Sequence, residues 1–231
     1  MITTDGTLLG GRVAYRQPAT GYRTGLEPVL LAAHCPAQPG DRVLEAGCGA
    51  GAGLLCLLTR VPGVLAEGVE IDSPTAELAR HNTGVVIHCT DICDYVPGPV
   101  YDHAIANPPW HAQNGTPSPL PSRTLAKQAD PALLDRWLRA LSALVRPRGT
   151  VTIIVPAAQF ISAATAARAA GLGGVCLTPI WPRAGVGAKL VLLRAVRGAR
   201  GPDQVAPGLV LHHADGFTSA AEAILRDGAA L

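Results

Sequence analysis

Residues 101–110 read YDHAIANPPW, a short apolar run followed by Asn-Pro-Pro-Trp. Tyr101 to Ala106 is a short, mostly apolar run that predicts a buried strand. Pro108 and Pro109 have no N–H to donate to a sheet, and Asn107 is biased toward extended backbone by the ring that follows it. We therefore expect a stiff, stretched segment at the C-terminal end of a strand. In an open α/β sheet, ligands bind at that end of the strands.

The side chains of this segment suit a planar group that carries an –NH2, such as a nucleobase. Asn107 offers a carbonyl oxygen, Pro108 a backbone carbonyl, and Trp110 a flat apolar face. The structural alternative is a proline-rich turn that ends a strand, with Trp110 as a core residue, because Asn-Pro is a common turn dipeptide.

The composition indicates a globular chain of 231 residues, of which 48% are hydrophobic and 16% are charged. That length fits one large domain, or a domain with a small appendage. The most apolar stretch, 149–167, is interrupted by Pro156 and Gln159, so no membrane span is expected. The first residues, MITTDG, do not resemble a signal peptide. We therefore expect a cytoplasmic protein that does not bind membranes; the sequence leaves the oligomeric state open.

The cysteines are interpreted as reduced, buried thiols. None of the six forms a C-x-x-C pair, and all lie in apolar contexts that resemble strands or helices. Cys89 and Cys93 lie near His88, but their spacing matches no common zinc pattern, so we expect no metal.

The net charge of +2 conceals a strong asymmetry. Residues 136–200 contain ten Lys or Arg and no Asp or Glu, whereas the remainder carries nine basic and seventeen acidic residues. Such segregation is the electrostatic signature of a protein that binds a polyanion. A preference for Arg over Lys accounts for the arginines but leaves the missing acids unexplained.

From residue 42 onward, strand-like and helix-like runs alternate. Strands are predicted at 42–46, 64–70, 85–89, 101–106, 150–155, 174–181 and 188–196, and helices at 52–60, 73–82, 130–145, 157–170 and 219–226. Ser73 is the expected N-cap of the second of these helices, with Pro74 at its first position. This alternation predicts a doubly wound α/β fold with a mainly parallel, Rossmann-like, seven-stranded sheet and helices on both faces.

The remaining segments complete the predicted organisation. Residues 1–40 are expected to form an ordered arm followed by a short helix at 29–34, and 41–231 the main domain, within a single domain overall. Residues 111–130 are polar and Pro-rich, and a loop of that length inside a compact domain is usually functional, for example as a lid.

The first strand of the main domain leads directly into EAGCGAG at 45–51. Closely spaced glycines after a strand let a ligand approach the backbone, and the N-terminus of the following helix is free to face it. Gly47 and Gly49 also satisfy the dinucleotide fingerprint, with Ala52 as its permitted last residue. Glu70, at the end of the second strand, is placed to accept from a ribose diol. These features fit NAD and S-adenosylmethionine equally well.

Three features favour S-adenosylmethionine. Glu45 would repel a pyrophosphate but suits a ligand with an ammonium or sulfonium group. Asp91, after the third strand, can accept from an adenine amino group. The segment 107–110 has no role in hydride transfer. The alternatives are a solvated loop acid for Glu45 and a helix N-cap for Asp91.

With 45–51, Glu70 and 107–110 in this order, the chain resembles the class I S-adenosylmethionine-dependent methyltransferases that act on amino groups. More narrowly, it resembles the bacterial tRNA1(Val) adenine-37 N6-methyltransferases. The resemblance covers nearly the whole chain, including the stretches at 21–25, 30–33, 188–192 and 211–216. The Asn-Pro-Pro-aromatic motif is specific to amino-group methylation, and the other stretches narrow the family.

This resemblance implies S-adenosyl-L-methionine as cofactor and an RNA, most naturally a tRNA, as partner. It implies that Asn107 and the Pro108 carbonyl accept hydrogen bonds from the substrate –NH2, that Pro109 completes the catalytic segment, and that Trp110 stacks on the flipped base. The residues expected to hold the cofactor are Thr24, Glu45, Gly47, Gly49, Glu70, Ile71, Asp91, Ile92 and Asn107. From the basic region, Arg194, Arg197 and Arg200 are predicted to bind the RNA.

The chain departs from the family pattern at three positions. Trp110 stands where Tyr or Phe is frequent, and Glu45 and Glu70 stand where many relatives have Asp. Three alternatives remain: methylation of protein glutamine N5, methylation of rRNA guanine N2, and an RNA-binding protein that kept the fold without catalysis.

Overall fold

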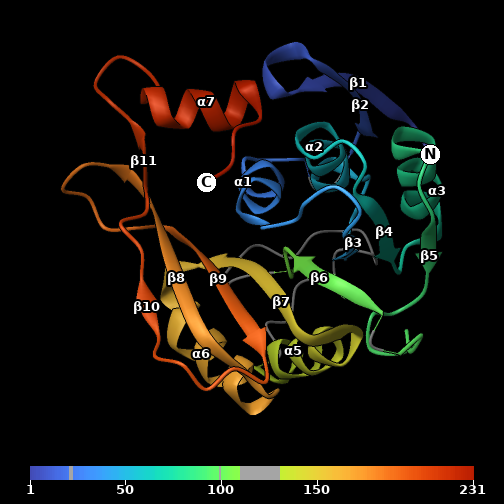
Figure 1. Ribbon diagram of the computed structural model, residues 1–231. Helices are drawn as coiled ribbons and strands as arrows, with labels where there is room; N and C mark the ends of the chain where they lie inside the picture. Colours follow the sequence, from blue (N-terminus) through green and yellow to red (C-terminus); the bar gives the residue numbers. More distant parts are fainter. Residues whose placement is uncertain (21–22, 99, 110–130) are drawn as a thin grey trace.

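The computed structural model describes residues 1–20, 23–98, 100–109 and 131–231. Its centre is a nine-stranded sheet in the order β10-β8-β9-β7-β6-β3-β4-β5, with β11 also paired to β8 (Figure 1). Strands β3 to β7 are parallel to one another, and β9 is antiparallel to both of its neighbours. The strands are β3 (Arg42–Ala46), β4 (Leu65–Glu70), β5 (Ile87–Cys89), β6 (Tyr101–Ala106), β7 (Val145–Pro156), β8 (Leu172–Arg183), β9 (Leu190–Arg197), β10 (Gln204–Val205) and β11 (Leu209–His212).

Helices cover both faces of this sheet, and they divide the core in two. Side chains alternate between the faces of a strand, so Ile154 and Leu192 join one hydrophobic cluster whereas Ile153 and Leu193 join the other. The first cluster includes side chains of α1 (Glu27–His34), α2 (Ala52–Arg60), α3 (Ser73–Thr83) and α7 (Ser219–Asp227). The second includes side chains of α5 (Pro131–Leu144) and α6 (Phe160–Ala169). The doubly wound fold expected from the sequence is confirmed.

The differences from the predicted elements are local. The seven expected strands are present, and two short strands, β10 and β11, are added to them. The N-cap of α3 is Asp72 and not Ser73, because the Asp72 carboxylate accepts from the Thr75 N–H at 3.0 Å. Strand β7 begins five residues earlier than predicted, at Val145, which pairs with Tyr101. Gln159 belongs to a 3₁₀ turn, η2 (Ala157–Gln159), that precedes α6.

The N-terminal arm is a β-hairpin, which the sequence did not predict. Strands β1 (Thr3–Leu8) and β2 (Val13–Pro18) are antiparallel and are joined by the 3₁₀ turn η1 (Leu9–Gly11). Arg12 forms an ion pair with Asp227 of α7 at 2.7 Å. The chain ends beside α1, where the Leu231 N–H donates to the Ala33 carbonyl at 3.0 Å.

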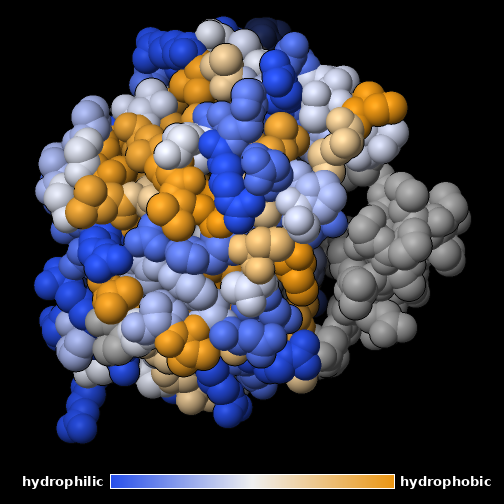
Figure 2. Space-filling model, turned by 90° about the vertical axis from the view of Figure 1, so that its right-hand side faces the viewer, coloured by the Kyte–Doolittle hydropathy of each residue, from blue (hydrophilic) through white to orange (hydrophobic). Residues whose placement is uncertain are grey.

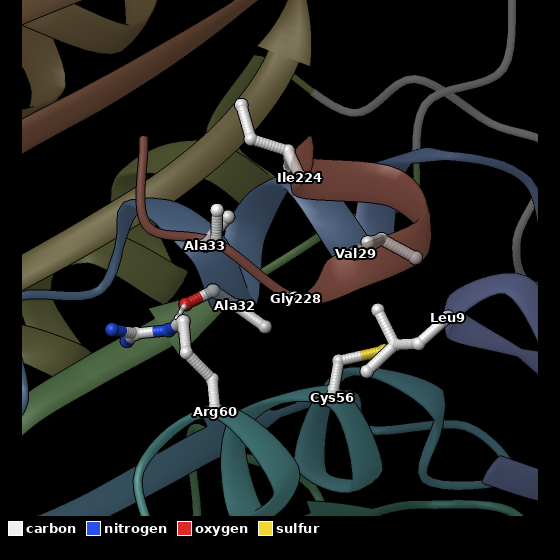
Figure 3. Close-up of a pocket in the computed structure, with 9 residues that line it drawn as sticks. Leu9, Val29, Ala32, Ala33, Cys56, Arg60, Ile224 and Gly228 are labelled. Atoms are coloured by element: carbon white, nitrogen blue, oxygen red, sulfur yellow. Dashed lines mark hydrogen bonds between the residues drawn. The ribbon is translucent and has the colours of Figure 1, made fainter. Parts of the chain in front are cut away.

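We propose that residues 1–40 and 41–231 fold as one unit. Leu9 and the α1 residues lie in the same buried cluster as α2 and α7. Figure 3 shows the apolar hollow where these elements meet, lined by side chains from η1, α1, α2 and α7, with the Arg60 Nε donating to the Ala32 carbonyl at its rim at 3.1 Å. Separating the arm would expose this cluster to water.

The outer surface mixes polar and apolar groups. On the side that carries α3 and β5, Figure 2 shows several hydrophobic patches between hydrophilic ones. Among the described residues, no helix combines the length and the apolar character that a membrane crossing requires. The six cysteines are free thiols. Cys35, Cys48 and Cys56 are buried as expected, whereas Cys93 and Cys176 are only partly buried and Cys89 is exposed, contrary to the prediction.

Candidate cofactor and substrate site

The register of the sheet brings the predicted motifs to one edge. Ala46 pairs with Ala106 on one side and with Val69 on the other. Paired residues of neighbouring strands are about 4.8 Å apart, so Gly47 and Asn107, the next residues along two parallel strands, leave the sheet side by side. Glu70 ends β4 on the other side of Ala46. The carboxyl edge of β3, β4 and β6 therefore carries the glycine bend, the acid and the Asn-Pro-Pro segment.

The glycine bend after β3 has one packed and one open position. Gly47 has a φ of +63°, and a Cβ built on it would lie 2.8 Å from the Trp137 ring of α5. Gly49 has a φ of +54°, and a Cβ built there would meet no atom within 4 Å. A glycine at position 47 lets α5 approach the loop, whereas a glycine at 49 leaves room above the loop for a ligand.

Each carboxylate oxygen of Glu70 accepts a hydrogen bond from a backbone N–H. One carboxylate oxygen accepts from the Gly49 N–H at 3.0 Å, and the other accepts from the Asp72 N–H at 2.9 Å. Each oxygen has a second lone pair, so the carboxylate can still accept from a ribose diol. Burial raises the pKa of Glu70, with the neighbouring charge of Asp72 adding to it, although hydrogen bonds from Asp72 and Gly49 oppose the shift.

Glu45 lies beneath the loop. Its exposed fraction is 3%, and a Cβ on Gly53 would lie 2.3 Å from one of its oxygens. The Leu54 N–H donates to this carboxyl group, but within the described part of the chain Oε2 has no hydrogen-bond partner. Burial, and the charge of Glu70, raise the pKa of Glu45 to about 8. The side chain is thus mostly protonated at neutral pH and supports the first turn of α2, below the open face of the bend.

The other predicted cofactor residues differ in accessibility. Ile71 follows Glu70 and is 67% exposed, so its side chain is free to cover a planar ring. Asp91 accepts from the Cys93 N–H at 2.8 Å within a turn at 92–94, and not at the start of a helix, so it is not the helix N-cap that was its alternative role. Ile92 is buried in the cluster beneath α5. The Thr24 hydroxyl is 2.8 Å from the Tyr15 hydroxyl of β2, so Thr24 is tied to the hairpin.

Two contacts that sequence reasoning missed hold the bend in place. The Trp137 ring packs against Gly47, as described above. The Asn82 amide of α3 donates to the Ala50 carbonyl at 2.8 Å and to the Arg16 carbonyl at 2.7 Å. Asn82 thus connects the glycine bend to the N-terminal hairpin. The amphipathic pattern of the helix beginning at 131 predicts that Trp137 is buried, but no local signal names its partner.

Asn107 and Pro109 are partly buried and Pro108 is buried. These residues have no regular secondary structure and continue directly from β6. Trp110 and the predicted lid at 111–130 lie outside the described residues.

The structure does not bring the three predicted RNA-binding arginines together. Arg194 and Arg197 are three residues apart in β9, so their side chains leave opposite faces of the sheet. Arg197 donates to the Val145 carbonyl at 2.5 Å, and the charge of Arg194 adds to burial in lowering the pKa of His34 to about 4. Val196 pairs with Thr150, which pairs in turn with His103 in the first half of β6, so Arg197 and Arg200 lie toward the amino edge of the parallel strands, away from Asn107.

Comparisons with known proteins agree with this arrangement. A family model described as the methyltransferase small domain matches residues 28–135. The tRNA1(Val) (adenine(37)-N6)-methyltransferase of Aeromonas hydrophila is 33% identical over 205 residues, which cover 85% of each chain. The chain belongs to the class I S-adenosylmethionine-dependent methyltransferases.

Other relatives of this methyltransferase support the assignment. The protein of the same name from Aeromonas salmonicida is 31% identical, again over 85% of each chain. A solved structure of a predicted O-methyltransferase from Agrobacterium tumefaciens has the same fold, with a TM-score of 0.74, 22% identity, and coverage of 89% of this chain and 98% of the other. As in the other members of this class, the methyl donor is S-adenosyl-L-methionine.

The residues at the carboxyl edge fit this cofactor. The open face at Gly49 gives room for backbone contact, and Glu70 beside it retains acceptor capacity for the ribose hydroxyls. The exposed Ile71 side chain suits the apolar face of adenine. We propose that Glu70 and Gly49, with Ile71 and Asp91 beside them, hold the cofactor, and that Glu45, Gly47 and Ile92 shape the loop from below.

Proposed function

We propose that this methyltransferase transfers a methyl group to an exocyclic amino group in RNA, and that its substrate is adenine N6 in a tRNA. The observation that carries the proposal is the pairing of Ala46 with Ala106, which puts Asn107 next to the glycine bend. A bound methyl donor and an –NH2 held by Asn107 would then meet at the same edge of the sheet. The names of the Aeromonas relatives support tRNA adenine as the target.

The proposed mechanism rests on positioning. The lone pair of an adenine N6 is delocalised into the ring, so the nitrogen is a poor nucleophile. The Asn107 carbonyl oxygen and the Pro108 carbonyl would each accept one of its hydrogens, which draws the nitrogen toward tetrahedral geometry and directs its lone pair outward. Two acceptors fixed on a proline-stiffened segment can align both reactants, and such alignment is worth roughly 7–11 kcal/mol in the best cases.

Proton transfer is separate from methyl transfer in this proposal. When bound, the cofactor supplies an electrophilic methyl group on a sulfonium. The amino nitrogen would carry both of its hydrogens while its bond to the methyl carbon forms and the S–C bond breaks, with the electron pair of that bond left on sulfur. One hydrogen would then leave the nitrogen as a proton to solvent. No general base is therefore required before the transfer. The adenine must be unstacked to reach Asn107, at a cost of a few kcal/mol.

The test is methylation of tRNA by the purified protein. Unmodified bulk tRNA would be incubated with methyl-labelled S-adenosylmethionine, digested to nucleosides and analysed by mass spectrometry. N6-methyladenosine is the expected product. N2-methylguanosine would favour the rRNA guanine alternative, and label in protein but not in RNA would favour the glutamine N5 alternative. Cofactor binding without transfer to any of these would support an RNA-binding protein that kept the fold.

A further inference from the structure

A basic and apolar surface lies on the same edge of the sheet as Asn107, beyond β7. It is formed by the start of α6 and by the turn between β8 and β9, which lies across the sheet from β5 in Figure 1. We call it the β7-side patch. Its members are Phe160, Ile161, Arg183, Val186 and Lys189, all of which are exposed.

Sheet topology places this patch at the carboxyl edge. Strand β7 pairs with β6 through Ile153 and Ala106, continues to Pro156, and leads through η2 into Phe160. Strand β9 is antiparallel to both β7 and β8, so β8 runs in the direction of β7 and ends at this edge with Arg183. The centres of β6 and β8 are three strand spacings apart, roughly 14 Å.

A backbone hydrogen bond connects the two segments that carry the patch. The Ala157 N–H donates to the Lys189 carbonyl at 2.8 Å, which fixes the turn between β8 and β9 against the segment that leads into α6. Within that turn, the Val186 N–H donates to the Arg183 carbonyl at 3.2 Å. The turn that carries Arg183 and Lys189 is thus fixed beside the segment that leads into Phe160 and Ile161.

The apolar side chains of the patch are exposed to solvent. Phe160 is 42% exposed, Ile161 64% and Val186 46%. Several other cations of the basic segment have intramolecular partners: Arg146 pairs with Asp102, Arg168 with Asp203, and Arg197 with backbone carbonyls. Within the described residues, no hydrogen bond or ion pair engages the side chains of Arg183 and Lys189, and residues 136–200 contain no acid.

We infer that the β7-side patch binds the single-stranded RNA that flanks the target nucleotide, with Arg183 and Lys189 on phosphates and Phe160 stacked on a neighbouring base. Proteins that hold single-stranded nucleic acid combine cationic groups along the backbone with aromatic side chains under the bases. The patch offers both on the edge where the reaction is proposed to occur. This inference rests on the proposed RNA substrate, and it puts the RNA on the opposite edge from Arg197 and Arg200.

The test compares two charge-matched pairs of substitutions in the full-length protein. The patch pair is Arg183→Gln with Lys189→Gln. The control pair is Arg146→Gln with Arg148→Gln, which removes two exposed cations of the same basic segment at the amino edge. Binding of unmodified tRNA transcript would be measured by fluorescence anisotropy over a series of salt concentrations. Thermal unfolding and calorimetry with S-adenosylmethionine would verify that each variant is folded.

We expect the patch pair to weaken binding and to reduce the slope of log affinity against log salt by about 1.4, from about 0.7 for each lost contact to a single strand. The control pair should leave the slope unchanged. Phe160→Ala should weaken binding by roughly 5- to 150-fold, the range expected for one stacked base, whereas Phe160→Trp should retain the affinity.

The inference is overturned if the patch pair leaves the slope unchanged, or if the control pair reduces it as much. The surface would then serve another partner, such as a protein. The two failures are distinguishable, because wild-type protein that binds S-adenosylmethionine but neither binds nor methylates RNA would refute the proposed function itself.

Discussion

The polar side chains at the two edges of the parallel sheet have different kinds of hydrogen-bond partner. Toward the amino ends of the strands, these groups form hydrogen bonds and ion pairs with one another. Glu67 accepts from Arg42 and from the Tyr101 hydroxyl, both at 3.0 Å, and lies 2.9 Å from His88. Burial alone would raise the pKa of Glu67, but hydrogen bonds from His88, Arg42 and Tyr101 outweigh it and hold the pKa below its usual value.

At the carboxyl edge, by contrast, the polar groups contact the backbone of a loop and keep capacity for a ligand. Glu70 accepts from two loop N–H groups, Gly49 faces open space, and Asn107 follows a strand without continuing the sheet. The polar groups at the amino edge thus satisfy one another in a saturated hydrogen-bond network. Those at the carboxyl edge keep acceptor capacity for a ligand, and we call this the receptive edge. Saturation stabilises the fold, whereas retained acceptor capacity is what a binding site needs.

The largest expected effect tests the receptive edge. Replacing Asn107 by Ala removes one of the two proposed acceptors, and we expect the rate of methyl transfer to fall 100-fold or more, about the effect of misplacing a reacting group. Affinity for S-adenosylmethionine, measured by calorimetry, should change little. Asn107→Asp is the matched control, because it keeps an acceptor oxygen and should retain part of the activity. Equal loss of cofactor affinity would instead mean that Asn107 supports the loop.

The next prediction compares Gly47, which packs against Trp137, with Gly49, which faces open space. Gly47→Ala combines left-handed backbone strain of about 1–2 kcal/mol with overpacking against Trp137 of about 1–3 kcal/mol. We therefore expect it to lower the free energy of unfolding by roughly 2–5 kcal/mol in urea denaturation. Gly49→Ala carries the backbone strain alone, but its methyl group fills the open face, so it should weaken cofactor binding more than stability.

A double-mutant cycle makes this contrast sharper. If the contact with Trp137 causes the additional loss of stability, then Gly47→Ala should lower the free energy of unfolding less in a Trp137→Leu background than in the wild type. The effects of the two substitutions should then not be additive. Strict additivity would show that the Trp137 ring does not limit position 47.

The third effect concerns the buried acid under the bend. The folded-state pKa of Glu45 is raised to about 8 and its unfolded value is near 4.5. Between these values the folded protein binds the proton and the unfolded chain does not, so rising pH favours unfolding. We expect Glu45→Gln, which does not titrate, to gain stability relative to the wild type between pH 5 and pH 8, by a few kcal/mol. The measurement is the urea midpoint of both proteins against pH, and a constant difference would contradict the assignment.

The smallest effect is expected at the saturated edge. Arg42→Gln breaks an ion pair with Glu67 whose arginine side chain is 44% exposed, so solvent screening limits the loss to about 1 kcal/mol or less. Cofactor affinity should remain at its wild-type value in calorimetry. A clear drop in that affinity would show that the two edges are coupled, and the contrast between them would then not hold.

The candidate site was largely predictable because its parts follow parallel strands. Strand, glycine bend and Asn-Pro-Pro are local patterns, and parallel pairing brings the ends of adjacent strands to one edge. Composition could not show how the arginines are arranged in space, because a charge count ignores the period of two along a strand. That period alone separates Arg194 from Arg197. The N-cap at Asp72 was missed by one residue, since Asp and Ser are both good caps.

The sequence by itself determined the order of strands and helices, the glycine bend after β3 and the Asn-Pro-Pro segment after β6, because backbone propensity and hydrophobic period are local properties. Only the tertiary structure decided that Glu45 is buried beneath the bend, that Trp137 packs on Gly47, and that Asn82 joins the bend to an N-terminal hairpin. These are contacts between segments far apart in the chain, and their formation depends on how whole elements pack and not on any local pattern.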